Sequence, residues 1–348
     1  MKKNTILFIV LVILAASAFW VFKKSGKSTL ADKPLTEFAI EDTSRVVKFV
    51  ITDHTGERAV LERVPGNKLW KLNNKYFARE DAVNLVLKTI NRIRIRGNVG
   101  DAARDNMLKL LATSGKKVEI YTGGEEPEKI YYVGVATPDH TGTVMLLEIP
   151  EIGRSEEPYI THIEGFTGFL STRFFTSEME WRYTGIFDYP QLEFKEVTVV
   201  NHIIPEQSFQ VKFDGKSGIN FMDAYNASTN EFGHQATSFD SVAVRNFLLN
   251  FKRVHVESFN TLLKPQERDS ILNLPPTYTV TVKGNNDQIS KVDLYLKKAV
   301  KDVFDEQGNR IPWDLGYLWA RTSDGELGLA QTYTFDPIVL PASSYSPK

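Results

Sequence analysis

The feature that most constrains the fold is a pattern of strands and helices that occurs twice along the chain. Residues Asp81–Ile95 align without a gap with Val242–Val256. This alignment pairs Ala82 with Ala243, Val83 with Val244, Leu87 with Leu248 and Arg92 with Arg253. The next helix and the next strand keep the same offset. The sequence therefore predicts one structural unit built twice.

Each copy is expected to begin with two alternating strands, which are Val46–Ile51 and Ala59–Val64 in the first copy and Ser208–Phe213 and Gly218–Met222 in the second. Apolar residues at helical spacing predict helices over 80–91, 241–252, 101–113 and 265–273. Further strands are predicted at Lys117–Tyr121, Ile130–Val135, Thr143–Glu148, Tyr278–Val282, Val292–Lys297, Leu318–Arg321 and Glu326–Thr332. Antiparallel hairpins dominate this order, which indicates the α+β class.

The N-terminus carries an unbroken run of apolar or small residues, Ile6–Phe22, with lysines on both sides. At ~1.5 Å per residue the run spans about 25 Å, the low end for a bilayer core. The alternative is a signal peptide cleaved at Ala16-Ser17-Ala18. Cleavage would leave Phe19 and Trp20 at an exposed start, so a retained transmembrane helix is favoured. We expect a single-pass protein of the bacterial inner membrane, with a cytoplasmic N-terminus and a periplasmic bulk.

The predicted organisation is an N-terminal transmembrane anchor followed by two tandem pseudo-repeated units of antiparallel sheet plus helices. The anchor covers residues 1–24 and a polar tether covers 25–37. The first α+β unit covers 38–149, an aromatic-rich connector covers 150–190, and the second unit covers 191–348.

Composition excludes several classes of function. Without the five lysines of residues 1–30, the chain has 37 basic and 43 acidic side chains, a formal net charge of −6. Nucleic acid is therefore not expected as a partner, because phosphate contacts need clustered cations. The chain contains no cysteine, which excludes disulfides, thiolate metal sites, cysteine nucleophiles and a lipid anchor on cysteine.

Motifs for catalysis are incomplete. Gly215-Lys216-Ser217 ends like a phosphate-binding loop, but Gln210 stands where the first glycine is needed. His54 and His140 share the tetrapeptide Asp-His-Thr-Gly, which a turn explains, and neither has convergent metal ligands nearby. The alternating arginines 92, 94 and 96 are interpreted as a solvated strand face. We expect no enzyme activity, no metal and no cofactor.

The best candidate for a binding site lies in the connector. Its residues are Phe166, Phe169, Arg173, Trp181 and Arg182. Arginine among aromatic rings suits recognition of a carboxylate, a glycan or a peptide, through bidentate hydrogen bonds and stacking. The same residues, together with Phe174 and Phe175, could instead form a core between the two units. The sequence leaves both alternatives open.

Several runs resemble a known family. They are Val47–Leu61, Gly66 with Trp70-Lys-Leu-Asn73, Tyr76-Phe-Ala78, Leu111–Gly115 with Val118, Tyr131–Gly134, Gly142–Glu148, Pro158-Tyr159, Gly165–Leu170, Arg173–Phe175 and Trp181-Arg182. Together they resemble a domain-of-unknown-function family of bacterial envelope proteins, common in Bacteroidetes-type bacteria, with one N-terminal anchor. Some members accompany auxiliary subunits of gliding-motility-type ABC transporters. The resemblance covers residues 40–260 and implies an envelope location, without catalytic residues.

These observations predict a non-enzymatic structural or adaptor component of a bacterial envelope complex, linked to transport or motility. The expected partners are the membrane, through residues 6–22, and other envelope proteins. The alternative is an extracytoplasmic peptide- or glycan-binding protein that uses the aromatic and arginine residues of the connector.

Overall fold

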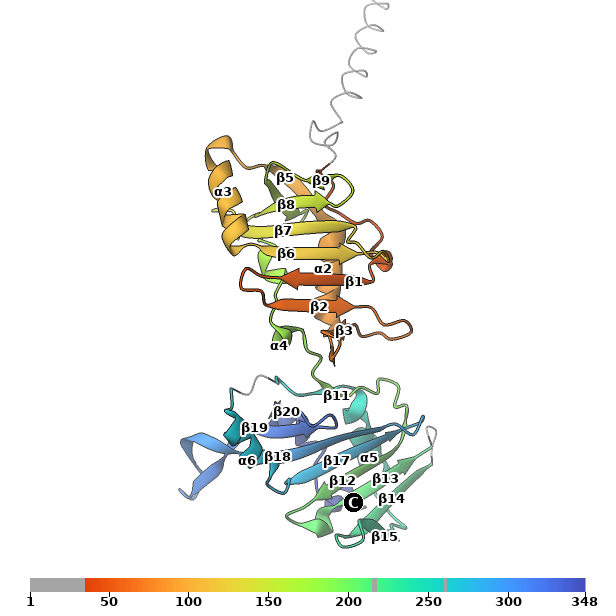
Figure 1. Cartoon of the computed structure of the whole chain (residues 1–348). Helices are drawn as coiled ribbons and strands as arrows, with labels where there is room; N and C mark the ends of the chain where they lie inside the picture. Colours follow the sequence, from red (N-terminus) through yellow and green to blue (C-terminus); the bar gives the residue numbers. More distant parts are fainter. Residues whose placement is uncertain (1–34, 215–217, 260–261, 348) are drawn as a thin grey trace, which may run out of the picture. The chain divides into compact units, whose positions relative to one another are not determined.

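The computed structural model describes residues 35–214, 218–259 and 262–347, and the chain forms two compact units (Figure 1). Unit 1 ends at Tyr183 and unit 2 begins at Thr184. The predicted anchor lies outside the described residues. Within the described ranges, no helix is long and apolar enough to cross a bilayer.

Unit 1 is an antiparallel sheet with a helix on each face (Figure 1). Its strands are β1 (Lys48–Thr52), β2 (Arg58–Glu62), β3 (Lys71–Leu72), β4 (Tyr76–Phe77), β5 (Ile93–Asn98), β6 (Lys116–Tyr121), β7 (Lys129–Ala136), β8 (Thr143–Ile149), β9 (Gly153–Arg154) and β10 (Tyr159–Ile163). Its helices are α2 (Glu80–Arg92), α3 (Asp101–Ser114) and α4 (Glu178–Trp181), with 3₁₀ turns η1 (Thr43–Arg45) and η2 (Ser171–Arg173). The strand order is β4-β3-β2-β1-β6-β7-β8-β10-β5, and β9 pairs with β8.

The two faces of this sheet receive different helices because side chains alternate along each strand. Phe49 and Ile51 of β1 face α2 and share the main core with its Val83 and Ile90. On the opposite face, Leu111 of α3 packs against Val144 and Leu146 of β8. Helix α2 is thus a core helix, whereas α3 covers part of the outer face.

Unit 2 contains a second antiparallel sheet. Its strands are β12 (Phe194–Asn201), β13 (Phe209–Phe213), β14 (Ile219–Asn226), β15 (Glu231–Gln235), β17 (Tyr278–Gly284), β18 (Ile289–Phe304), β19 (Arg310–Thr322) and β20 (Leu327–Gln331), while β11 (Gly185–Phe187) pairs with β16 (Val254–His255). Its helices are α5 (Ser241–Leu249), α6 (Pro265–Leu272) and α7 (Thr332–Phe335), with 3₁₀ turns η3 (Pro205–Gln207), η4 (Asn250–Lys252) and η5 (Ala342–Tyr345). The order of the large sheet is β15-β14-β13-β12-β17-β18-β19-β20.

The two large sheets share part of their connectivity. In each unit four strands run outward in sequence, a helix, a strand and a second helix follow, and the next strand returns to pair with the first strand, β6 with β1 and β17 with β12. The strand between the helices differs, because β5 is the end strand of the unit 1 sheet, whereas β16 pairs with β11 outside the large sheet of unit 2. In unit 2, α5 packs into the main core, and α6 packs against Tyr295, Trp319 and Leu327 on the other face. The first helix of each unit is therefore the core helix, and the second covers the outer face.

Local sequence explains the helix starts. The Asp240 side chain accepts hydrogen bonds from the backbone N–H groups of Val242 and Ala243 and so caps α5, as Asp does at N-caps. Pro265 occupies the first turn of α6, where no N–H partner is needed. The four predicted helices begin and end within a residue or two of their predicted positions, except that α5 ends at Leu249 and the chain continues as η4.

The equivalence of individual strands differs from the sequence alignment. By sheet position, β1 corresponds to β12, whereas the sequence placed Val46–Ile51 over Ser208–Phe213, which is β13. The sequence alignment is therefore displaced by one strand in this part of the unit. Strands β3 and β4 have only two residues each. As a result, the number of residues between β1 and α2 equals the number between β13 and α5.

The connector predicted at 150–190 is not a separate segment. Strand β10 lies inside the unit 1 sheet between β8 and β5. Leu170, Phe174 and Trp181 belong to the core of unit 1. The aromatic density that suggested a connector is explained by the last strand of a sheet and the segment that closes its core.

Candidate functional site

Two of the five predicted site residues are buried in unit 1. The side chain of Trp181 is 0% exposed, and its indole N–H donates a hydrogen bond to the carbonyl oxygen of Phe175 over 2.8 Å. Its ring packs against those of Phe49 and Phe175, with centroids 5.8 and 4.2 Å away. Arg182 is 2% exposed, and its guanidinium lies 3.8 Å from the centre of the Tyr76 ring. Neither residue presents a surface to a ligand.

The other three predicted residues lie nearer the surface. Arg173 is half-buried and donates to the Thr89 hydroxyl of α2 over 2.9 Å. Its guanidinium also lies 4.3 Å from the ring centre of the exposed Phe166. Burial lowers the pKa of Arg173 from its usual value. Phe169 instead contacts His140, with ring centroids 5.9 Å apart. The arrangement fixes η2 to α2 and does not gather the five residues into one site.

The structure agrees only in part with the interpretation of arginines 92, 94 and 96 as a solvated strand face. Arg94 and Arg96 are exposed on β5, as a solvated strand face requires. Arg92 is instead the last residue of α2 and donates to the Glu164 carbonyl oxygen over 3.0 Å.

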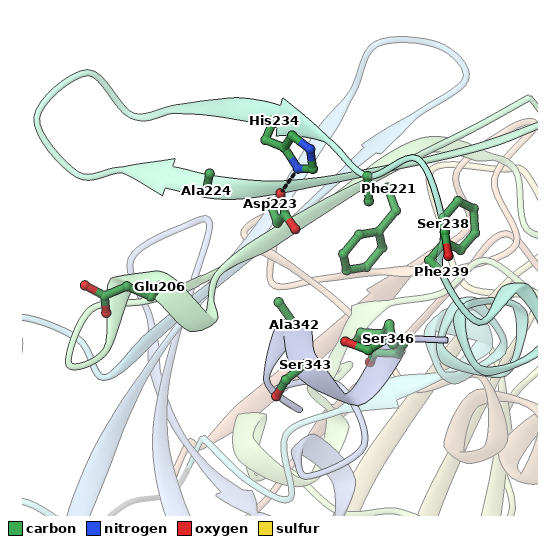
Figure 2. Close-up of a pocket in the computed structure, with 12 residues that line it drawn as sticks. Glu206, Phe221, Asp223, Ala224, His234, Ser238, Phe239, Ala342, Ser343 and Ser346 are labelled. Atoms are coloured by element: carbon green, nitrogen blue, oxygen red, sulfur yellow. Dashed lines mark hydrogen bonds and ion pairs between the residues drawn. The ribbon is translucent and has the colours of Figure 1, made fainter. Parts of the chain in front are cut away.

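A pocket of about 330 Å³ in unit 2 is a concave site that contains none of the predicted residues (Figure 2). It is lined by Glu206, Phe221, Asp223, Ala224, His234, Ala236, Ser238, Phe239, Ala342, Ser343, Tyr345 and Ser346. These residues come from η3, the β14–β15 hairpin, the segment that leads to α5, and η5 near the C-terminus. Figure 2 shows Asp223 and His234 on one side of the pocket, and Ala342 and Ser343 on another.

The polar side of the pocket is a hydrogen-bonded Asp–His pair formed by strand register. Asp223 on β14 lies directly opposite His234 on β15, and their side chains approach to 2.6 Å between Oδ1 and Nδ1. Among the described residues, His234 makes no hydrogen bond to Ser238, Ser343 or any other serine. A nucleophilic triad needs that second hydrogen bond, so the pair is not arranged for acyl transfer.

The apolar floor of the pocket is a cluster of aromatic rings. Phe221 packs against Phe239 and Tyr345, with centroids 5.9 and 5.6 Å apart. Tyr345 is 3% exposed, and its hydroxyl has no hydrogen-bond partner among the described residues. Burial raises the pKa of Tyr345 far above the usual value, so the phenol stays protonated at neutral pH.

The second unusual surface of unit 2 is a two-stranded extension, which we call the arm and define as residues 297–316 of β18 and β19. It is the blue hairpin at the left of unit 2 in Figure 1. The arm pairs Lys298 with Trp313 and Val303 with Ile311. Its exposed apolar side chains are Val300 (87% exposed), Phe304 (59%), Trp313 (38%) and Leu315 (60%).

Charges on the arm are balanced and partly paired. Lys297 contacts Asp314 over 2.5 Å at the base, and Arg310 contacts Asp302 over 2.8 Å near the tip. Strand β20 pairs with β19 as far as Tyr317, and in the described part of the chain no third strand pairs with residues 297–316. The apolar side chains of the arm therefore have little cover. Isolated two-stranded hairpins of this kind are marginally stable in water.

In the described ranges, no group of three or more His, Asp or Glu side chains is placed to hold a metal ion.

Searches against protein-family models, curated proteins and solved structures returned no match to this chain. The resemblance to an envelope family therefore stays a prediction from the sequence.

The pocket and the arm were both missed at the level of sequence. Asp223 and His234 are joined only by the register of a hairpin that the sequence did not predict beyond Met222. The arm had a clear signal, because Val292–Phe304 and Arg310–Thr322 are long runs rich in β-branched and aromatic residues on either side of Asp305–Asn309. Because only short strands were predicted in these two runs, the full length of the arm was not recognised.

Proposed function

We propose that this protein is a non-enzymatic structural or adaptor component of a bacterial envelope complex, and that the arm contacts a partner protein. The observation that carries the proposal is the row of exposed apolar side chains on a projecting hairpin. Exposed apolar side chains gathered on one surface element are typical of interaction sites in soluble proteins. Aromatic residues such as Trp313 are also enriched among the residues that dominate binding energy.

The shape of the arm suits a protein partner. Ile311, Trp313 and Leu315 alternate along β19, so they lie on one face of the strand, and Val303 pairs with Ile311 across the ladder. The lysines and arginine of the arm are matched by an equal number of acidic side chains. A surface with an apolar row and no net charge is unsuited to a nucleic acid or an anionic lipid surface, both of which recruit basic patches.

Three further features support the proposal. The run Ile6–Phe22 would hold the chain at the inner membrane with the described residues on the periplasmic side. The shared strand order and helix placement support two tandem copies of one α+β unit. The sequence resemblance suggests a link to transport or motility. The peptide- or glycan-binding alternative rested on the connector, and the burial of Trp181 and Arg182 removes its central residues.

The arm is tested by affinity purification of the full chain from detergent-solubilised membranes. We expect the wild type to retain a stoichiometric protein partner, and a variant carrying Trp313→Ser and Leu315→Ser to lose it. Truncating a hot-spot residue, a class enriched in tryptophan, weakens binding by about 2 kcal/mol or more.

The matched control is Ile203→Ser, which changes a similarly exposed apolar side chain (63%) in a loop of unit 2. Both variants should melt at the temperature of the wild type. Retention of the partner by the arm variant, or its loss from the control as well, would contradict the role of the arm.

The anchor is tested on the native protein. Carbonate washing should leave the chain in the membrane fraction, and mass spectrometry should find the N-terminal Met1-Lys2-Lys3 intact. A mature chain that starts at Phe19 would show that the leader is cleaved.

A further inference from the structure

The outer edge of β18 in the arm has no pairing strand. Strand β17 pairs with β18 only as far as Leu294, and no other described strand pairs with this edge at residues 297–304. A register shift between Lys298 and Val303 also leaves residues 299–302 without partners on β19. Unpaired N–H and C=O groups along an edge are a template on which another chain can add a strand.

The residue types on this edge decide which strand can add to it. Residues 297–304 of β18 include neither proline nor glycine, whereas β19 carries Pro312, which has no N–H to donate. Lys298 and Lys301 are exposed, and neither forms an ion pair in the described part of the chain. Lysine on an edge discourages pairing, because like charges directly opposite each other destabilise a strand pair. An added strand must therefore place a carboxylate opposite a lysine, and no cation there.

A second copy of β18 meets this requirement in one register. If two copies run antiparallel about a two-fold axis at Val300, Lys298 of each copy lies opposite Asp302 of the other. Lys301 then lies opposite the small Ala299, and Val300 lies opposite its own counterpart. The Asp302 side chain is 63% exposed and contacts Arg310 through Oδ1, so its other oxygen faces no cation of its own chain. Unlike charges directly opposite each other stabilise such a pair.

Neighbouring registers bring like charges together. Alternate residues of a strand direct their N–H and C=O groups to the same edge, so the two-fold axis falls on a residue. An axis at Ala299 would place Lys297 opposite Lys301 of the other copy. An axis at Lys298, Lys301 or Asp302 would place that charged residue opposite itself. The lysines that protect this edge against other strands thus leave one register open to a second copy.

We propose that β18 of the arm binds the same strand of a second copy of this chain, antiparallel about a two-fold axis at Val300. Such a contact is isologous, the commonest form of homodimer interface. It differs from the proposed adaptor contact, whose Trp313 and Leu315 lie on β19. The paired segments are shorter than a standard interface, which buries about 1,600 Å², so the dimer is expected to dissociate on dilution.

Disulfide trapping tests the dimer, because the chain contains no cysteine and an introduced thiol reports on one position. In the proposed register, Val300→Cys brings two thiols together across the axis, with Cα atoms about 4.5–5.5 Å apart. That separation lies within the range of disulfides, which ends near ~7 Å. Mild oxidation of the full-length variant in detergent should therefore convert most of it to a covalent dimer.

The matched control is Phe304→Cys, which changes another exposed apolar residue of the same strand. In the proposed register Phe304 lies opposite Leu296 of the second copy, so the two introduced thiols would be about 27 Å apart along the strand. This variant should stay monomeric under the same oxidation. Absence of a covalent dimer of Val300→Cys, or equal dimer yields from the two variants, would overturn the proposal.

Charge exchange tests the register in the Val300→Cys background. Lys298→Asp and Asp302→Lys each place like charges opposite each other twice in the dimer and should lower the yield of covalent dimer by about tenfold. The double variant restores unlike pairs and should recover the yield. Asp302→Lys also removes the contact with Arg310, but damage to the arm alone would persist in the double variant. Failure of the double variant to recover would refute this register.

The dimer and the adaptor contact fail separately. If the partner protein is retained through Trp313 and Leu315 but Val300→Cys gives no covalent dimer, the dimer is refuted and the adaptor contact stands. If Val300→Cys forms the covalent dimer but no partner protein is retained, the dimer stands and the adaptor contact is refuted.

Discussion

Replacing Trp181 by alanine should destabilise unit 1 strongly. The side chain is completely buried, and truncation of a buried aromatic residue costs about 3–5 kcal/mol. The change also removes the hydrogen bond to the Phe175 carbonyl and the ring contacts with Phe49 and Phe175. Such bonds and ring pairs contribute about 0.5–1.5 kcal/mol each. We therefore expect a loss in the upper part of that range, about 4–5 kcal/mol.

Differential scanning calorimetry on the full chain measures this loss. For a unit of this size, 1 kcal/mol shifts the melting temperature by about 2–4 °C, so the transition of unit 1 should fall by roughly 8–20 °C. The transition of unit 2 should stay in place. Trp313→Ala is the matched control, because it removes the same side chain from an exposed position and should leave both transitions within about 2 °C. A Trp181→Ala variant that melts with the wild type would refute the assignment of Trp181 to the core.

Two further predictions concern the outer faces of the sheets. A Cβ atom at Gly134 would lie 2.7 Å from the Leu111 side chain of α3, so Gly134→Ala should lower the free energy of unfolding by about 1–3 kcal/mol, as measured by urea denaturation. In unit 2, burial alone would raise the pKa of Asp293, but hydrogen bonds from Thr279 and Arg321 hold it below its usual value. A lowered pKa in the folded state stabilises the fold above the unfolded pKa of ~3.9, and this contribution is lost as the pH falls below ~4. Asp293→Asn should therefore reduce the loss of stability of unit 2 between about pH 5 and pH 2, and an acid unfolding curve identical to that of the wild type would contradict the reasoning.

Most of the regular structure could be predicted from the sequence because its signals are local. Helix α2 differs from its prediction by one residue. Its apolar spacing and its acidic first turn are local signals, because both depend on residues close together in the sequence. Strand β12 was missed although it lies at the centre of its sheet. A register shift between Phe194 and Glu196 interrupts the alternation of its side chains, so the period of two is not visible over its length.

The position of β10 and the pocket could not be predicted because they depend on pairing between distant segments. Strand β10 has a clear alternation over Tyr159–Ile163, but nothing local indicates that it inserts between β8 and β5. The same holds for Glu206 and Tyr345, which line one pocket although they are far apart in the chain. For Asp223 and His234 a local signal existed. A hairpin turning at Asn226–Glu231 would have placed them opposite each other.

The proposed repeat strengthens the case for the arm. By sheet position, β7 and β8 of unit 1 correspond to β18 and β19 of unit 2. Strand β7 ends at Ala136 and β8 begins at Thr143, so the hairpin of unit 1 closes with a short turn, in which Thr137 and Gly142 are hydrogen bonded. In unit 2 the equivalent hairpin continues past the sheet before it turns at Asp305. The sheet does not need this extension, since the shorter hairpin completes the same strand order. Additions at hairpin ends are tolerated by the fold and commonly carry function. The exposed apolar side chains of this addition lie outside the core clusters of unit 2, and contact with a partner protein is the role that we propose for them.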